Sequence, residues 1–166
     1  MKKNKRKFIT FGAPSIKNNE LKAVSQVLKS GWLGTGPKVE LFEKAFKNYK
    51  KSKFAVSCSS ATAALHLSLI NCELQPQDEV ITTAMTFCST VNSIIHSGAK
   101  PVIVDIESST GNIDINQLKK AINKNTKAII PVHYAGRPCN MDQIIEIAGN
   151  NNLKVIEDCA HAIETE

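Results

Sequence analysis

The fold is decided by one stretch near the end of the chain, Lys154-Val155-Ile156-Glu157-Asp158-Cys159-Ala160-His161. A short β-branched run that ends in a carboxylate and is followed by small residues is typical of a buried parallel strand. In open α/β sheets, ligands bind at the C-terminal edge of such strands. Asp158 can therefore pair with a cationic group of a ligand, and His161 can reach the same ligand from the loop. The alternative is that Asp158 only caps a following helix.

The sequence before this stretch alternates between helical and extended patterns. Apolar periodicity and turn residues predict helices over 18–29, 38–50, 59–67, 88–96, 112–123 and 141–149, and strands over 53–58, 77–83, 100–105, 127–133 and 154–158. This alternation predicts an α/β fold, with a mainly parallel sheet and helices on both faces. Asn18 or Asn19 is expected to cap the first helix. The aromatic residues of the second helix, Phe42, Phe46 and Tyr49, are expected to pack in the core.

Composition and charge exclude several classes of protein. The 166-residue chain has a net charge of +6, but five of its basic residues lie in the tail 1–7, and the remainder has 16 basic against 15 acidic side chains. We therefore expect no nucleic-acid partner. The sequence has no apolar run of membrane-spanning length and opens without the apolar segment of a secretory signal, which predicts a cytoplasmic protein without a membrane partner. The five cysteines and four histidines lack zinc-ligand spacing, so we expect reduced thiols and no metal.

A second polar element, Ser59-Ser60-Ala61-Thr62, joins a predicted strand to a predicted helix. Backbone N–H groups at a helix start, the positive end of the helix dipole and nearby hydroxyl groups together form a site for a phosphate group. The simpler alternative is a serine that only caps the helix. His66, within the apolar part of this helix, is expected to be an ordinary core histidine.

The loop Trp32–Pro37 contains two glycines, Gly34 and Gly36, where a ligand or another backbone segment can come close. The loop is not a dinucleotide-binding fingerprint, because no strand precedes it and the third glycine of that motif is missing.

Seven motifs of this chain follow one another in a recognisable order. They are GWLGTGP (31–37), SSATAALHL (59–67), DEVI (78–81), MTF (85–87), GAKPV (98–102), PVHYAGRP (131–138) and VIEDCAH (155–161). Together they resemble the pyridoxal-phosphate-dependent sugar-nucleotide aminotransferases of the DegT/DnrJ/EryC1/StrS type, over nearly the whole chain after the basic tail. The resemblance implies the large domain of the fold type I (aspartate aminotransferase-like) fold. Residues 1–166 would be the N-terminal part of that PLP-binding domain, without its C-terminal part and without the small domain.

The same resemblance implies roles for individual residues. Asp158 would pair with the protonated pyridine nitrogen of pyridoxal 5′-phosphate (PLP), which makes the ring an electron sink. Phe87 would stack on the ring, and His161 would lie near its phenolic oxygen. Ala61 and Thr62 would hold the phosphate group, Ser60 is also assigned to the cofactor, and Thr35 and Gly36 are assigned to the substrate.

The chain also departs from the family pattern. The family usually has glycine at the position of Ala61, where a methyl group is tolerated if the backbone needs no positive φ. Cys159 replaces a common alanine, and packing is the expected role of its thiol. The lysine that forms the Schiff base with the cofactor is expected beyond Glu166. The chain as given therefore contains no catalytic residue and is expected to be inactive alone.

The resemblance implies that the complete protein is an enzyme acting as a homodimer. It would transfer an amino group, usually from glutamate in this family, to a nucleotide-linked keto sugar in surface-polysaccharide or amino-sugar biosynthesis. Two alternatives stay open. One is a PLP-dependent sugar dehydratase of the same family, in which histidine replaces the lysine. The other is a non-catalytic module that binds a phosphorylated ligand or a partner chain.

Overall fold

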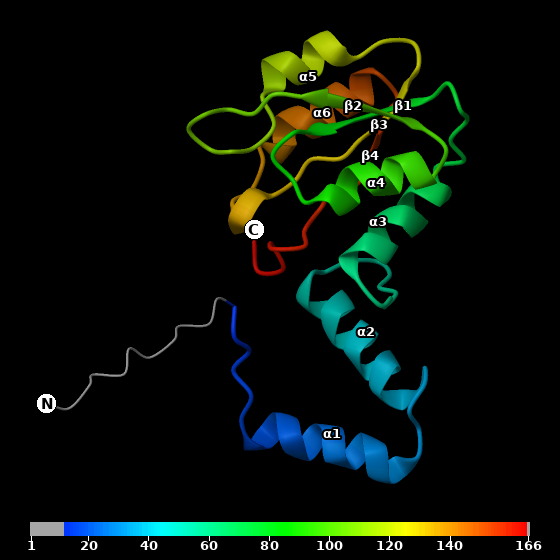
Figure 1. Ribbon diagram of the computed structural model, residues 1–166, viewed down its shortest axis with the longest axis vertical. Helices are drawn as coiled ribbons and strands as arrows, with labels where there is room; N and C mark the ends of the chain where they lie inside the picture. Colours follow the sequence, from blue (N-terminus) through cyan, green and yellow to red (C-terminus); the bar gives the residue numbers. More distant parts are fainter. Residues whose placement is uncertain (1–11, 166) are drawn as a thin grey trace, which may run out of the picture. The chain divides into compact units, whose positions relative to one another are not determined.

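The computed structural model describes residues 12–165, which divide between Ser57 and Cys58 into two compact units (Figure 1). The basic tail at residues 1–7 lies outside the described residues. None of the helices in the described part of the chain is long and apolar enough to cross a membrane.

The first unit contains two helices, α1 (Asn18–Ser30) and α2 (Pro37–Tyr49). Helix α1 begins at Asn18 as expected, but its N-cap is Lys17, whose backbone N–H donates to the Glu20 carboxylate at 2.7 Å. The expectation that Asn18 or Asn19 caps this helix was therefore wrong. Gly31 ends α1 with a φ of 72°, a left-handed conformation that favours glycine.

Two further expectations for the first unit were wrong. Residues 53–58 form no strand, and Phe54 and Val56 are exposed, because no strand pairs with this segment among the described residues. The aromatic stripe of α2 is not a core: Phe42 and Tyr49 are more than half exposed. The amphipathic pattern predicted the helix correctly, but a buried face also needs a partner layer, and the described residues supply none for it.

The second unit is an alternating α/β structure with one 3₁₀ turn. Its elements are α3 (Ala61–Ile70), β1 (Glu79–Thr83), α4 (Cys88–His96), β2 (Lys100–Val104), α5 (Ile115–Ala121), β3 (Thr126–Ile129), η1 (Tyr134–Gly136), α6 (Met141–Asn150) and β4 (Lys154–Val155). The four strands form one parallel sheet in the order β2-β1-β3-β4. The predicted fold class is thereby confirmed.

Helices cover both faces of this sheet (Figure 1). Consecutive residues of a strand point to opposite faces. On one face, Ile81 and Ile129 pack with apolar residues of α5 and α6. On the other face, Val80, Ala128 and Ile130 pack with α3 and α4. The central strands β1 and β3 are therefore apolar on both sides, as a buried parallel sheet requires.

Two helices differ from their predicted form. Helix α5 starts at Ile115 rather than at residue 112, because the Asp114 carboxylate accepts the N–H groups of Asn116 and Gln117 and so fixes the first turn there. Helix α3 runs over Ala61–Ile70 rather than 59–67, because Ser60 is its N-cap, and it is only partly buried. Leu65 and Leu69 face the sheet, whereas Leu67 and Ile70 are exposed.

The order of the strands places a switch point between β1 and β3. From β1 the chain proceeds through α4 to β2 on one side, and from β3 it proceeds through α6 to β4 on the other. The connections that leave the C-terminal ends of β1 and β3 therefore diverge. In an open α/β sheet this divergence creates the crevice in which ligands bind.

Candidate functional site

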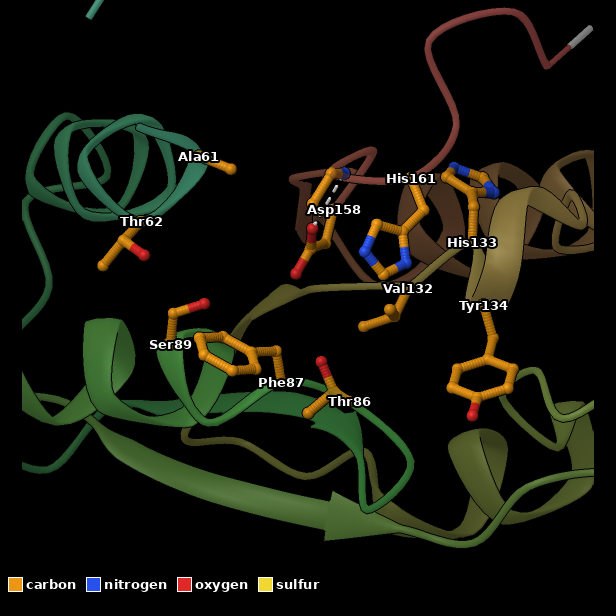
Figure 2. Close-up of a pocket in the computed structure, with 11 residues that line it drawn as sticks. Ala61, Thr62, Thr86, Phe87, Ser89, Val132, His133, Tyr134, Asp158 and His161 are labelled. Atoms are coloured by element: carbon orange, nitrogen blue, oxygen red, sulfur yellow. Dashed lines mark hydrogen bonds between the residues drawn. The ribbon is translucent and has the colours of Figure 1, made fainter. Parts of the chain in front are cut away.

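A pocket of about 340 Å³ lies at this C-terminal edge of the sheet (Figure 2). It is lined by Ala61, Thr62, Thr86, Phe87, Ser89, Val132, His133, Tyr134, Asp158, Ala160 and His161. These residues come from the start of α3 and from the segments that follow β1, β3 and β4. Five of the six residues that the resemblance assigns to the cofactor are thus brought to one cavity from distant parts of the sequence.

Backbone pairing fixes the position of Asp158. Its N–H donates to the carbonyl of Pro131 at 2.9 Å, and its own carbonyl accepts the N–H of His133 at 3.2 Å. These two bonds form a parallel bridge between Val132 and Asp158, which extends the pairing of β3 and β4 beyond their assigned ends. Asp158 is therefore held at the sheet edge by the ladder itself, and its side chain is buried.

The carboxylate of Asp158 is also fixed by two hydrogen bonds. Thr90 Oγ1 donates to Oδ2 at 2.7 Å, and the backbone N–H of Ala160 donates to Oδ1 at 3.2 Å. Thr90 is completely buried on α4, and its hydroxyl group also bonds the hydroxyl of Thr86 at 2.7 Å. The carboxylate that faces the pocket therefore has a defined orientation.

The start of α3 combines a cap with unused donors. Ser60 is the N-cap, and its Oγ accepts the N–H of Ala63 at 3.1 Å. Within the described part of the chain, the N–H groups of Ala61 and Thr62 have no hydrogen-bond partner. Together with the helix dipole, they form an anion-binding end that opens into the pocket. Ala61 has no positive φ, so its methyl group is compatible with the backbone there.

Ser60 does not line the pocket, and the expectation that it binds the cofactor stays a prediction. Its side chain acts as the serine cap that the sequence allowed as an alternative.

Phe87 and His161 stand at opposite sides of the pocket (Figure 2). Phe87 is the N-cap of α4, with extended backbone, and its ring is 73% exposed. An exposed aromatic ring beside a pocket is available to stack on a flat ligand. The loop that carries His161 passes close to Gly136, whose φ is 84° and whose missing Cβ would lie 3.0 Å from the His161 carbonyl oxygen. Gly136 therefore allows the two loops to approach each other.

A buried histidine lines the pocket and belongs to a group of potential metal ligands formed by His133, Glu157 and Cys159. His133 Nδ1 accepts the backbone N–H of Cys139 at 3.1 Å, so Nε2 carries the proton. Nε2 lies 2.9 Å from Glu157 Oε2 and donates to it. A protonated nitrogen cannot ligate a metal, and this arrangement is an oriented histidine–carboxylate pair instead. Cys159 is exposed, contrary to the expectation that its thiol packs.

Several residues that line or support the pocket were not predicted from the sequence. Ser89, Thr86 and Thr90 lie within four positions of Phe87, and a cluster of hydroxyl residues around a predicted strand-to-helix turn was the available signal. Val132 and Tyr134 follow β3 at the same edge. Their position after a buried strand could have indicated them.

Thr35 and Gly36 lie in the first unit, in the loop before α2. The Thr35 carbonyl accepts a hydrogen bond from Trp32 Nε1 at 3.0 Å, and the indole of Trp32 occupies the space that a Cβ of Gly36 would need. Glycine is therefore required at position 36 for close packing. Gly36 lines a cavity of about 500 Å³ within the first unit, and Thr35 does not. Their predicted role in substrate binding stays a prediction.

Comparison with known proteins decides the family. The sequence profile of the DegT/DnrJ/EryC1/StrS aminotransferase family matches residues 14–166 of this chain. The chain belongs to this family. Among curated relatives, the protein MJ1066 of Methanocaldococcus jannaschii is 52% identical over 153 residues, which are 92% of this chain and 40% of that protein. The spore coat polysaccharide biosynthesis protein SpsC of Bacillus subtilis is 48% identical over 158 residues, 95% of this chain and 41% of SpsC.

Solved structures of relatives show the same fold. Spr1654 of Streptococcus pneumoniae, solved in a PLP form and in a pyridoxamine phosphate (PMP) form, matches with a TM-score of 0.88 at 37% identity. The match covers 93% of this chain. NtdA of B. subtilis with bound PMP matches with a TM-score of 0.85 at 38% identity, over 89% of this chain and 35% of NtdA. The chain spans about two fifths of the length of the curated relatives it matches.

The family's cofactor is PLP, and the pocket fits it. The oriented Asp158 carboxylate can accept a hydrogen bond from a ring nitrogen, and Phe87 can cover a ring. The N–H groups of Ala61 and Thr62, which have no partner among residues 12–165, can bind a phosphate group. The contacts of individual residues with the cofactor stay predictions.

Proposed function

We propose that this chain is the N-terminal part of the PLP-binding large domain of an aminotransferase that acts on a nucleotide-linked keto sugar. The amino donor in this proposal is glutamate, and the product serves surface-polysaccharide or amino-sugar biosynthesis. The supporting observation is the pocket at the switch point, where the Asp158 carboxylate and the start of α3 face the same cavity. Family membership and the polysaccharide-related name of SpsC agree with it.

The bound cofactor supplies an electron-withdrawing ring that accepts and releases an amino group. In the proposal, Asp158 binds the ring nitrogen and keeps it protonated, because a buried anion stabilises a neighbouring positive charge. Phe87 covers one face of the ring, and His161 lies beside the phenolic oxygen. The N–H groups of Ala61 and Thr62 and the Thr62 hydroxyl group bind the phosphate.

Substrate recognition belongs to the first unit in this proposal, through Thr35 and Gly36 of the loop before α2. The lysine that binds the cofactor covalently comes from a segment beyond Glu166. The complete protein is a cytoplasmic homodimer.

The proposal is tested by co-expressing this chain with the C-terminal three fifths of a close relative such as SpsC. Amino transfer from glutamate to a nucleotide-linked keto sugar is then measured for the complex and for each piece alone. We expect activity only for the complex, and its loss when the lysine of the C-terminal piece is replaced by alanine. A soluble complex that binds PLP but transfers no amino group to any keto sugar nucleotide would overturn the proposed activity.

A further inference from the structure

We infer that Thr90 and Thr86 are positioning residues that hold the Asp158 carboxylate toward the cofactor's ring nitrogen through a directed chain of hydrogen bonds. The inference rests on the proposed function, because it needs the ring nitrogen to lie at Asp158. It assigns a role to two hydroxyl groups on α4 and in the preceding turn, neither of which needs to touch the cofactor.

The direction of the chain follows from the groups themselves. An ionised carboxylate only accepts hydrogen bonds, so the proton of Thr90 Oγ1 points to Asp158 Oδ2, 2.7 Å away. Because a hydroxyl group has a single proton, the contact between Thr86 and Thr90, also 2.7 Å, must use the proton of Thr86. The order of donation is therefore Thr86 to Thr90 to Asp158. Each bond in such a chain polarises the next one.

Burial makes this chain specific. Thr90 is 0% exposed and Asp158 is 6% exposed, so the hydrogen bond between them is shielded from solvent. The other oxygen, Oδ1, already accepts the N–H of Ala160. With one donor on each oxygen, the carboxylate cannot rotate freely about its last bond. Asp158 and Thr86 both line the pocket, so this fixed carboxylate is available to a ligand there.

A purely structural role for Thr90 makes a different prediction. A buried hydroxyl group that only stabilises α4 would affect every ligand of the pocket equally when it is removed. A hydroxyl group that acts through Asp158 would affect only ligands with a ring nitrogen. The chain offers a matched control in Thr82, which is also fully buried and donates to the Ile130 carbonyl at 3.0 Å, but does not line the pocket.

The experiment measures the affinity of two non-covalent ligands by fluorescence titration. One ligand is PMP, which binds without a lysine, and the other is its analogue with carbon in place of the ring nitrogen. The protein is the 166-residue chain, in complex with the C-terminal piece of SpsC if it needs that piece to stay soluble. The variants are Thr90→Val, Thr90→Ser, Thr86→Val and the control Thr82→Val, each checked for folding by circular dichroism.

We expect the wild type to prefer PMP over the carbon analogue, and Thr90→Val to lose roughly tenfold of this preference, the size of one hydrogen bond to a charged group. Thr86→Val should lose a smaller part. Thr90→Ser and Thr82→Val should retain the preference, even where their stability falls.

Equal weakening of both ligands in Thr90→Val, or an unchanged preference, would overturn the role of Thr90 and leave the proposed cofactor site intact. If Thr90→Val does not fold, the same two results are read from Thr86→Val. A wild type that binds neither ligand, or binds both equally, would overturn the pairing of Asp158 with the nitrogen, and with it both the cofactor geometry and this inference.

Discussion

The start of α3 gives the most quantitative test of phosphate binding. Ser60 already satisfies the N–H of Ala63, which leaves the N–H groups of Ala61 and Thr62 and the Thr62 hydroxyl for a ligand. Thr62→Val removes only the hydroxyl and keeps the shape of the side chain. Thr62 is exposed at the pocket wall, so the hydrogen bond should lie at the low end of those made to charged groups, about 1.5 kcal/mol. That value corresponds to an approximately tenfold loss of affinity.

The assay is a titration of wild type and Thr62→Val with PMP and with pyridoxamine, which lacks the phosphate group. PMP should bind about tenfold more weakly to the variant, and pyridoxamine should be almost unaffected. Ser68→Ala, a hydroxyl deletion on the exposed side of the same helix, is the matched control and should change neither affinity. Equal losses for both ligands would refute the reasoning and reduce Thr62 to a structural residue of the helix start.

Three further predictions concern catalysis, loop packing and thiol reactivity. In the complex with the C-terminal piece, Asp158→Asn should lower the rate of amino transfer by about a hundredfold or more, because a neutral amide cannot stabilise the ring's positive charge. The free energy of unfolding should change little. Near-normal turnover would disprove the pairing of Asp158 with the ring nitrogen. Gly136→Ala should lower the free energy of unfolding in urea by about 1–3 kcal/mol, because the added Cβ would sit at a φ of 84° and 3.0 Å from the His161 carbonyl oxygen. An unchanged midpoint of urea unfolding would show that this loop relaxes freely. Burial raises the pKa of the Cys139 thiol to about 11, so Cys139 should resist alkylation at neutral pH, whereas the exposed Cys88 should react. Mass spectrometry of the labelled protein measures both reactions. Rapid labelling of Cys139 in the folded chain would contradict its burial.

The raised pKa of Cys139 also predicts how the stability of the fold changes with pH. A group whose pKa is raised on folding, here from 9.0 to about 11, stabilises the fold below pH 9 and loses that contribution as the pH rises toward 11. Cys139→Ala should therefore flatten the loss of stability in that alkaline range. A profile with the same slope for both proteins would show that other groups cause it.

Local sequence patterns predicted the four strands of the sheet and the edge that carries the site, although the same patterns also predicted a strand at 53–58 that does not form. The strands and the turn at Asp158 follow from β-branched runs with polar residues at their ends, and the parallel order follows from the helices between them. Once the strand ends are known, Asp158 and Phe87 must share one edge. Their convergence on a single pocket was therefore predictable in outline.

Other features depend on contacts that local patterns do not encode. The hydroxyl group of Thr90 bonds a residue 68 positions away, and nothing in its own helix indicates that partner. Residues 53–58 have strand composition, but a strand also needs a neighbour to pair with, and the described residues provide none. The exposed face of α2, with Phe42, has the same cause: an amphipathic helix predicts its own apolar face but not the surface that covers it.

The central claim is that the Asp158 carboxylate holds a protonated ring nitrogen in this pocket. The most direct measurement is the ¹⁵N NMR chemical shift of ring-labelled PMP bound to the protein, taken at a pH where the nitrogen of free PMP is unprotonated. We predict the shift of a protonated nitrogen in the wild type and that of a neutral nitrogen in Asp158→Asn. A neutral nitrogen in the wild-type complex, or a protonated one that persists in Asp158→Asn, would contradict the account.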